Sequence, residues 1–379
     1  MSAVLNNEPE VDAPTASRPE SPPTGRPPRV DARWLWWGGL PLALACVALA
    51  ATQGAYAITL DDLPLLWAWW WRPADAPFDP DLTAAQVFWH IRAPRLLMAC
   101  LAGAALGVSG AMIQGLFRNP LADPGLIGVS AGGALGAACC IVLLPLLGWM
   151  PVGFAAGWSG MAATMVCAFV GGVLVTALAW RLSRRQGQVH LANLLLVGLA
   201  INALAMAGLG LLTYLASDTQ QRALNFWLLG SLAPSQWVTV LAVLAPVLLA
   251  LIGARALQRP LDALALGEAQ ARVMGVNVKR LQVSCVGLTA LAVGAVTAVI
   301  GMVGFIGLLA PHLVRLLLGP RHQVVLPGSA LLGACLVMLA DTAARTVAAP
   351  VELPLGVLTG LIGAPVFLYL LQQRGPRAH

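Results

Sequence analysis

Long apolar runs separated by short polar segments dominate the sequence. A membrane-spanning helix needs about 20 mostly apolar residues, and ten segments fit that template. The eighth is the shortest, and it requires a turn at Gly301–Gly304 that divides the nearly uncharged run 281–319 into two crossings. The pattern predicts an all-α polytopic membrane protein with ten transmembrane helices per subunit. The segments lie at about 35–56, 93–116, 126–146, 158–181, 191–215, 236–256, 281–300, 303–319, 327–346 and 355–373.

The composition agrees with a membrane protein. Of the 379 residues, 59% are hydrophobic and 10% are charged, whereas soluble domains carry about 25% charged residues. All seven cysteines lie inside apolar runs, where a thiol acts as a small hydrophobe, so neither a disulfide framework nor a zinc site is indicated. The net charge of +6 would suit nucleic acid, but most basic residues flank apolar runs. We therefore expect membrane lipid as a partner and no nucleic acid.

The two ends of the chain are expected to lie outside the membrane domain. The first 33 residues are polar and rich in proline, which predicts a disordered tail. The sequence AYA at 55–57 resembles a signal-peptidase site, but the apolar stretch before it is too long for a signal peptide, so we expect an uncleaved first span. The predicted organisation is a disordered cytoplasmic tail at 1–33, a transmembrane domain at 34–373 and a short cytoplasmic tail at 374–379.

The distribution of Lys and Arg predicts the orientation, because cytoplasmic loops are enriched in both. With a cytoplasmic N-terminus, 17 of the 22 basic residues lie at inner ends and 5 at outer ends. Both termini are then cytoplasmic, and a shift by one span would reverse the ratio. The tryptophan-rich loop at 60–81 is placed outside, where its tryptophans are expected as interfacial anchors. The polar segment 261–280 is placed inside, facing a soluble part of the cell.

No enzyme active site is indicated. The only lysine, Lys279, is followed by Arg280, so the chain lacks the Gly-Lys-Ser/Thr of a phosphate-binding loop. The five histidines show no metal-ligand spacing, and no HExxH or GxSxG motif occurs. We expect no catalytic residue, no metal and no permanently bound cofactor.

Three arginines at the outer side have two open interpretations. Arg92 and Arg95 lie three residues apart at the mouth of the second span, where ordinary snorkelling would explain them. Arg345 follows Asp341 by four residues, which predicts an intrahelical ion pair. The same arginines would also suit the carboxylates of a partner protein, since a guanidinium binds a carboxylate with two hydrogen bonds. Spacing alone does not separate the two.

Two glycine-rich stretches predict close helix packing and helix breaks. In 103–137, small residues recur at helix-packing spacing. Within it, Pro120 and Pro124 bracket a turn in which Asn119 or Asp123 is expected to accept hydrogen bonds from helix-end amides. In 294–319, glycines and a proline resemble the interrupted helices that line pathways in transporters, although tight packing explains any single glycine equally well.

Six segments carry distinctive motifs: IRAPRLLMACLAGAALGVSGAMIQGLFRNPLADPGLIGVSAGGALG (91–136), FWLLGSL (226–232), LGEAQARVMGV (266–276), GFIGLLAPHLVR (304–315), ADTAART (340–346) and ELPLGVLTGLIGAPVFLYLL (352–371). Together these motifs resemble the FecCD-type permeases, the membrane subunits of bacterial ABC importers for vitamin B12, ferric siderophores and haem. The resemblance covers about 56–373 in order. It implies a homodimer in the bacterial inner membrane, two ATPase subunits at the cytoplasmic face and a periplasmic substrate-binding protein, with ATP acting only through the partner subunit.

The resemblance also implies roles for particular residues. The segment at about 259–277 is similar to the coupling helices that insert into a groove of the ATPase, where Glu268 would offer a charge and the glycines would allow close backbone approach. The expected ATPase-docking residues are Gly267, Glu268, Ala271, Arg272 and Gly275. Arg92, Arg95 and Arg345 match arginines that engage acidic residues of the binding protein, which favours the docking interpretation.

The substrate is inferred from segment 198–237, which is most similar to the haem permeases of the family; a ferric siderophore and cobalamin are the alternatives. Passage requires weak, transient contacts, so haem needs no fixed axial ligand. Tyr214 and Arg222 are candidate pathway residues, although Tyr214 would equally suit an interfacial anchor. The rival class is an ion-coupled transporter, which would need ionisable groups at mid-membrane, where only Asp341 comes near.

Overall fold

The computed structural model describes residues 35–54, 56, 58–71, 82–151, 157–185, 188–189 and 191–372. The predicted tails at 1–33 and 374–379 lie outside these residues. The described chain is almost entirely helical, with one short antiparallel hairpin in which Arg184 is opposite Val189.

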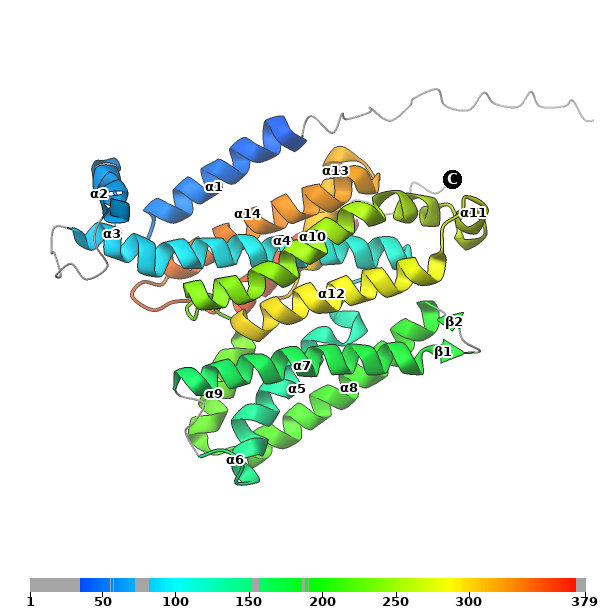
Figure 1. The fold of residues 1–379 in the computed structure, drawn as a ribbon, viewed down its shortest axis with the longest axis horizontal. Coiled ribbons are helices and arrows are strands. Elements are labelled where there is room, and N and C mark those ends of the chain that lie inside the picture. The colour runs from blue at the N-terminus through cyan, green and yellow to red at the C-terminus, as the bar shows by residue number, and fades with distance from the viewer. Residues whose placement is uncertain are drawn as a thin grey trace, which may run out of the picture.

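The elements follow the order of the predicted spans (Figure 1). A π-helical turn at Leu35–Gly39 precedes α1, and similar turns join α3 to α4 and α5 to α6. The bounds are α1 Leu40–Thr52, α2 Leu63–Ala68, α3 Thr83–Val87, α4 Ala93–Phe117, α5 Val129–Ala138, α6 Leu144–Leu146, α7 Trp158–Leu182, β1 Arg184–Arg185, β2 Gln188–Val189, α8 Leu191–Leu215, α9 Asp218–Leu229, α10 Trp237–Ala265, α11 Glu268–Val273, α12 Val278–Ile300, α13 Ile306–Leu318, α14 His322–Thr346 and α15 Leu355–Gln372.

A helix lies over each of the ten predicted segments, and seven are long and apolar enough to cross a membrane. These seven are Thr83–Phe117, Val129–Leu146, Trp158–Leu182, Leu191–Leu215, Trp237–Ala265, Val278–Ile300 and His322–Thr346. The other three are apolar but shorter: Trp37–Thr52, Ile306–Leu318 and Leu355–Leu370. Helix α9 was not predicted, because half of its residues are polar and its apolar stretch is too short for a membrane span.

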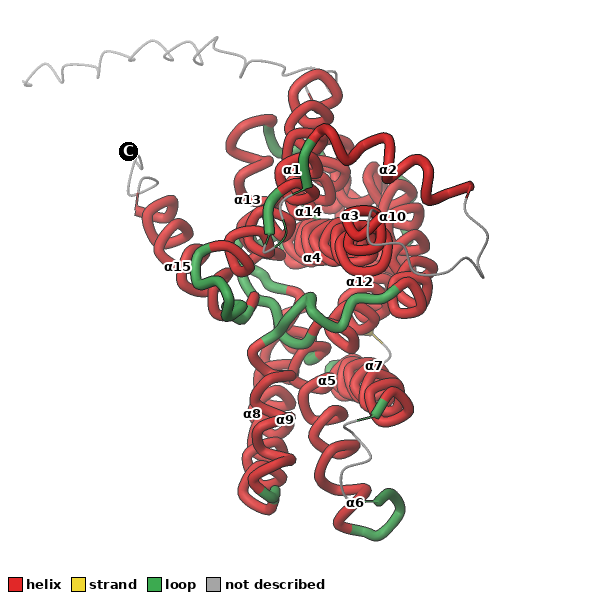
Figure 2. Tube along the Cα trace, turned by 90° about the vertical axis from the view of Figure 1, so that its left-hand side faces the viewer, coloured by secondary structure: helices red, strands yellow, loops and turns green. Residues whose placement is uncertain are grey.

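The buried centre of the fold is α4, which is surrounded by α10, α12, α13 and α14 (Figure 2). Small residues make this possible, as the sequence predicted. Gly107 lies against the carbonyl of Ser329 on α14, and Gly110 lies against the carbonyl of Gly307 on α13. A Cβ at either glycine would overlap that oxygen, so the helix backbones are in direct contact.

A second group of helices, α5, α7, α8 and α9, packs beside this centre, and α12 contacts both groups (Figures 1 and 2). The turn between α4 and α5 has the predicted capping. Asp123 Oδ1 accepts a 2.7 Å hydrogen bond from the Gly125 amide, while Asn119 Oδ1 accepts one from Leu121 within the turn. Helix α11 and the hairpin lie at one end of the molecule, and α2, α3 and α9 lie at the other (Figure 1).

Candidate functional site

The polar segment predicted to face the cytoplasm forms a compact loop around α11. Helix α10 continues to Ala265, a short turn leads into α11, and α12 begins at Val278. Gly267 (φ 117°) and Gly275 (φ 81°) bound α11 in conformations that side-chain-bearing residues rarely adopt, while Ala271 between them is wholly buried. The two glycines and the alanine therefore define the shape of the loop.

The exposed surface of this loop is more apolar than the sequence reasoning anticipated. Glu268 and Arg272 form an exposed ion pair at 3.2 Å. The most exposed side chains are apolar, however: Val273 is 89% exposed and Met274 is 63% exposed. Apolar side chains at the tip of a polar loop are typical of a docking surface. The adjacent Val-Met before Gly275 was the signal that could have indicated it.

Polar contacts anchor the loop to the rest of the molecule. The Asp262 carboxylate, near the end of α10, accepts a 2.9 Å hydrogen bond from the backbone amide of His322 and lies 2.7 Å from its Nδ1. The Asn277 side chain caps α12 by accepting a hydrogen bond from the Arg280 amide at 3.0 Å. The loop is thus braced against α14 on one side and continues directly into α12 on the other.

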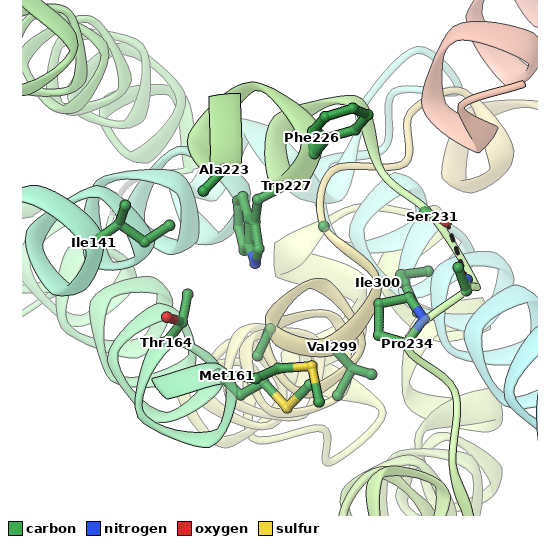
Figure 3. Close-up of a pocket in the computed structure, with 14 residues that line it drawn as sticks. Ile141, Met161, Thr164, Ala223, Phe226, Trp227, Ser231, Pro234, Val299 and Ile300 are labelled. Carbon is green, nitrogen blue, oxygen red and sulfur yellow. Dashed lines mark hydrogen bonds between the residues drawn. The ribbon is translucent and has the colours of Figure 1, made fainter. Parts of the chain in front are cut away.

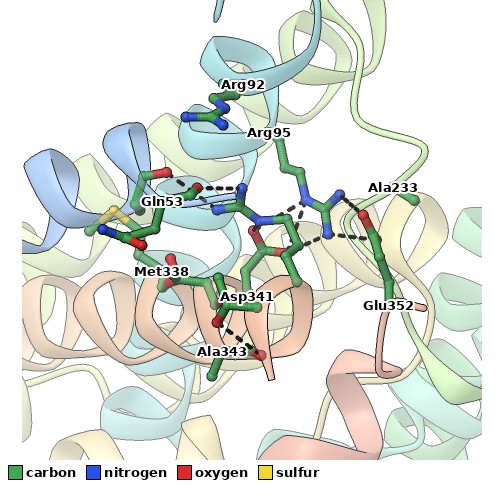
Figure 4. A network of polar contacts seen from close by, with 12 residues as sticks. Gln53, Arg92, Arg95, Ala233, Met338, Asp341, Ala343 and Glu352 are labelled. Carbon is green, nitrogen blue, oxygen red and sulfur yellow. Dashed lines mark hydrogen bonds and ion pairs between the residues drawn. The ribbon is translucent and has the colours of Figure 1, made fainter. Parts of the chain in front are cut away.

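At the opposite end, Arg95 holds two carboxylates (Figure 4). It binds both oxygens of Asp341, at 2.9 to 3.2 Å, and both oxygens of Glu352, at 2.9 Å. The predicted Asp341–Arg345 pair is confirmed at 3.0 Å. Arg95, with 9% of its surface exposed, lies at the centre of this cluster. Sequence reasoning missed Glu352, which lies in the segment between α14 and α15.

Arg92 and Arg345 also bind the end of α1. Arg92 donates to the carbonyls of Ala51, Thr52 and Tyr56, and Arg345 donates to the carbonyls of Ala50 and Gln53. These contacts satisfy carbonyls that a helix C-terminus leaves without intrahelical partners. All three predicted docking arginines therefore make internal contacts that join α1, α4 and α14, and their docking role stays a prediction.

The charge of Arg95 affects the half-buried Glu352. The hydrogen bonds from the Arg95 guanidinium lower the pKa of the Glu352 carboxyl below its ordinary value, against the opposite effect of burial. Asp341 is paired with two arginines, as expected for a structural ion cluster rather than for the unpaired mid-membrane group that an ion-coupled transporter would use.

Three helix breaks meet between the two helical groups. Helix α12 ends at Ile300, and residues 301–305 form the predicted interruption before α13. A Cβ at Gly301 (φ 74°) would overlap the Trp227 carbonyl, and one at Gly230 or Gly356 would crowd the Met302 carbonyl. We call Gly230, Gly301 and Gly356 the glycine junction. It brings together three segments that the sequence singled out separately.

An apolar cavity of about 330 Å³ lies beside the glycine junction (Figure 3). Its lining includes Met161 on α7, Phe226 and Trp227 on α9, and Ile300 and Gly301 at the end of α12. It therefore lies where the interrupted helices meet.

The predicted pathway residues lie elsewhere. Tyr214, near the end of α8, is 85% exposed, and Arg222 on α9 is also exposed; neither lines this cavity. Their pathway role stays a prediction. Among the described residues, no group of three His, Cys, Asp or Glu side chains is arranged to hold a metal ion.

Seven apolar helices long enough to cross a membrane, together with helices that are interrupted at a glycine junction, indicate a multi-pass membrane permease. The chain belongs to the FecCD transport family, whose model matches residues 42–373. It is the inner-membrane permease subunit of an ABC importer, a kind of subunit that lacks an ATPase site; a partner subunit hydrolyses the ATP.

Two curated relatives are similar over most of the chain. The hemin transport system permease protein HmuU of Yersinia pestis is 43% identical over 302 residues, which cover 77% of this chain and 86% of that protein. The vitamin B12 import system permease protein BtuC of an Escherichia coli strain is 38% identical over 303 residues, which cover 79% of this chain and 88% of that protein.

A solved structure has the same fold. It is a chain described as a metal-chelate type ABC transporter in an inward-facing conformation, with a TM-score of 0.75 and 30% sequence identity. The similarity covers 90% of this chain and 99% of that chain.

Proposed function

We propose that this permease carries haem from a periplasmic binding protein into the cytoplasm. The haem assignment is supported by the 43% identity to a hemin permease and by the apolar lining of the cavity beside the glycine junction, which suits a flat hydrophobic macrocycle. Cobalamin is the second candidate, favoured by the 38% identity to a vitamin B12 permease.

The observation that carries the mechanism is the path of α12. This helix starts directly after the α11 loop and ends at Gly301 in the glycine junction. Its 23 residues span about 35 Å, roughly the thickness of the bilayer core. A displacement of the loop by the ATPase would therefore reach the junction through one unbroken helix and change which side of the pathway is open.

The proposed assembly is a homodimer with ten spans per subunit and cytoplasmic termini. Two ATPase subunits dock on the α11 loop through Gly267, Glu268, Arg272 and Gly275, together with the exposed Val273 and Met274. Ala271, which was expected among the docking residues, is wholly buried and shapes the loop instead. The binding protein docks at the opposite end, over Arg92, Arg95 and Arg345. Tyr214 and Arg222 are proposed to face the pathway between the two copies. Both are exposed in a single copy, as residues in that position would be.

The test is uptake by proteoliposomes that contain the purified permease–ATPase complex, with loaded binding protein added outside. We expect ATP-dependent accumulation of haem and no accumulation with a non-hydrolysable nucleotide. Accumulation of cobalamin or a ferric siderophore in place of haem would overturn the substrate assignment but leave the importer assignment intact.

A further inference from the structure

A second cavity, of about 480 Å³, lies between α7 and α12, away from the glycine junction. We call it the α7–α12 groove. Its walls are almost entirely apolar, with Phe169 and Val173 on α7 and Val286 and Leu291 on α12. The two helices run side by side along the edge of the second helical group (Figure 1).

The length of the groove matches one leaflet of a membrane. On α7 its lining extends from Phe169 to Arg181, which lie twelve positions or about 18 Å apart along the helix. Half of a hydrocarbon core that is about 30 Å thick is about 15 Å. The groove therefore reaches from the α11 end of the molecule to near the bilayer centre, which is the depth of one acyl chain.

The end of the groove near α11 is basic. Arg181 lines it, and Lys279 and Arg280 precede the lining residue Val283 by four and three positions, so they extend the same face of α12. Arg184 lies over the Trp180 ring at 5.9 Å. The side chains of Arg181, Lys279 and Arg280 make no hydrogen bond or ion pair with residues that the structure describes.

No acidic residue neutralises this charge from the same stretches of chain. The sequence contains no Asp or Glu from 124 to 217, which includes α7, or from 269 to 340, which includes α12. The basic residues therefore have no acidic residue on their own helices, and an anion at the mouth of the groove would supply a counter-charge.

A buried polar group lies deeper in the groove. Thr176 lines it with only 3% of its surface exposed, and its Oγ1 has no hydrogen-bond partner among the described residues. It lies five residues from Arg181, about 7.5 Å further along the helix. An unpaired buried hydroxyl costs free energy, so an acceptor from a bound molecule would be favourable there.

We propose that the α7–α12 groove binds an anionic phospholipid of the cytoplasmic leaflet. One acyl chain lies along the apolar walls, Thr176 donates a hydrogen bond to an ester carbonyl, and the headgroup phosphate binds Arg181 with Lys279 and Arg280 beside it. Because α12 follows the α11 loop directly, the lipid braces the helix that joins the loop to the glycine junction. The leaflet assignment rests on the proposed cytoplasmic position of α11.

Native mass spectrometry of the delipidated chain tests this, with titration of phosphatidylglycerol and of phosphatidylcholine with identical acyl chains. We expect preferential retention of phosphatidylglycerol. The Arg181→Gln, Arg280→Gln double variant should weaken its binding about thirtyfold, since each basic residue contributes about 1 kcal/mol. A matched double variant, Arg118→Gln, Arg321→Gln, changes two exposed basic residues outside the groove and should bind as wild type does.

The apolar part of the groove has its own test. A Cβ at Gly287 meets no atom within 4 Å, so the side chain of Gly287→Leu would begin in open space and take up part of the groove. It should weaken phosphatidylglycerol binding, whereas Gly38→Leu, an equally open position elsewhere, should not.

Three results would overturn the proposal. They are equal binding of the two lipids by wild type, unchanged binding by the groove variants, and an equal loss in the groove and control variants. If the charge variant lost ATPase binding but kept phosphatidylglycerol, the basic residues would be assigned to the ATPase instead. None of these results depends on haem transport, so failure here is separable from failure of the proposed function.

Discussion

Arg95 lies at the centre of an ion cluster at the end of the molecule opposite the α11 loop. A single guanidinium makes five hydrogen bonds, three to Asp341 and two to Glu352, while Arg345 holds the remaining side of Asp341. A buried carboxylate is tolerated only when its charge is compensated in this way. The cluster therefore holds α4, α14 and the segment before α15 in one arrangement.

Substituting Arg95 should destabilise the fold. Arg95→Gln removes one of the two arginines that compensate the negative charge of Asp341, and breaking a buried ion pair costs about 3 kcal/mol. Arg95→Lys should restore little, since one ammonium group cannot bind two carboxylates with paired hydrogen bonds. Thermal unfolding in detergent measures the loss, with the exposed Arg222→Gln as the control; equal stability of all three variants would contradict the structural role.

The docking role of the arginines has a separate readout. We expect binding of the loaded binding protein to Arg92→Gln, Arg95→Gln protein to be weaker than to wild type. The wild-type affinity should fall with salt, because salt screens the charge-assisted contacts that the docking role requires. Measurement at a temperature well below unfolding separates docking from stability. Unchanged affinity at every salt concentration would leave the arginines with their internal role alone.

Glu352 should make stability depend on pH. Its pKa is lowered in the folded protein, so its contribution is complete above the ordinary value of 4.5 and is lost as the pH falls through the lowered folded pKa. Wild type should therefore melt at a higher temperature than Glu352→Gln at pH 7, and the difference should vanish in acid. Because Glu352 is half exposed, the effect should be small. A difference that grows in acid would contradict the assignment.

At the scale of elements, the glycine junction depends on the absence of side chains. Gly301→Ala places a Cβ against the Trp227 carbonyl at a positive φ, and the backbone strain alone costs about 1–2 kcal/mol. A Cβ at Gly304, three residues on, meets no atom within 4 Å. Gly301→Ala should therefore lower stability and uptake, while Gly304→Ala should retain both. Equal behaviour of the two variants would show that the junction does not require Gly301.

The α11 loop should couple ATP hydrolysis to transport. Its Glu268–Arg272 pair is exposed and contributes little to folding, so Glu268→Arg should fold normally but hydrolyse ATP without uptake. Val273→Asp should reduce ATPase binding by removing apolar contact area. Val347→Asp, at a valine that is 73% exposed at the opposite end, serves as the control. Coupled uptake by Glu268→Arg would disprove the role of this charge.

At the scale of the whole molecule, one copy leaves a large apolar surface on α8 and α15. Its exposed side chains include Leu204, Leu211, Leu361 and Tyr369. In the proposed homodimer part of this surface lines the pathway between the copies. Differently tagged copies expressed together should therefore co-purify in mild detergent with two permeases per complex. Recovery of only the copy whose tag was used for capture would contradict the homodimer.

Local features of the fold could be predicted from the sequence. The segments that became helices are recognisable because their apolar length matches a bilayer, and the break at Gly301–Gly304 is recognisable because glycine interrupts an uncharged run. The Asp341–Arg345 pair follows from helix geometry, which makes residues four apart neighbours. Helix α9 was missed because it is not apolar, although its Ser217–Gln220 capping box was a local signal.

Contacts between distant segments were decided only by the tertiary structure. Arg95 meets Asp341 and Glu352 across 246 and 257 residues of sequence, and the glycine junction joins the ends of α9, α12 and α15. Periodicity along one helix shows which face is apolar or small, but which helix packs on that face depends on how all of them cross. The sequence alone therefore determined the membrane class, the helices and the place of the α11 loop between two of them, whereas helix packing decided that Arg92, Arg95 and Arg345 bind within the chain.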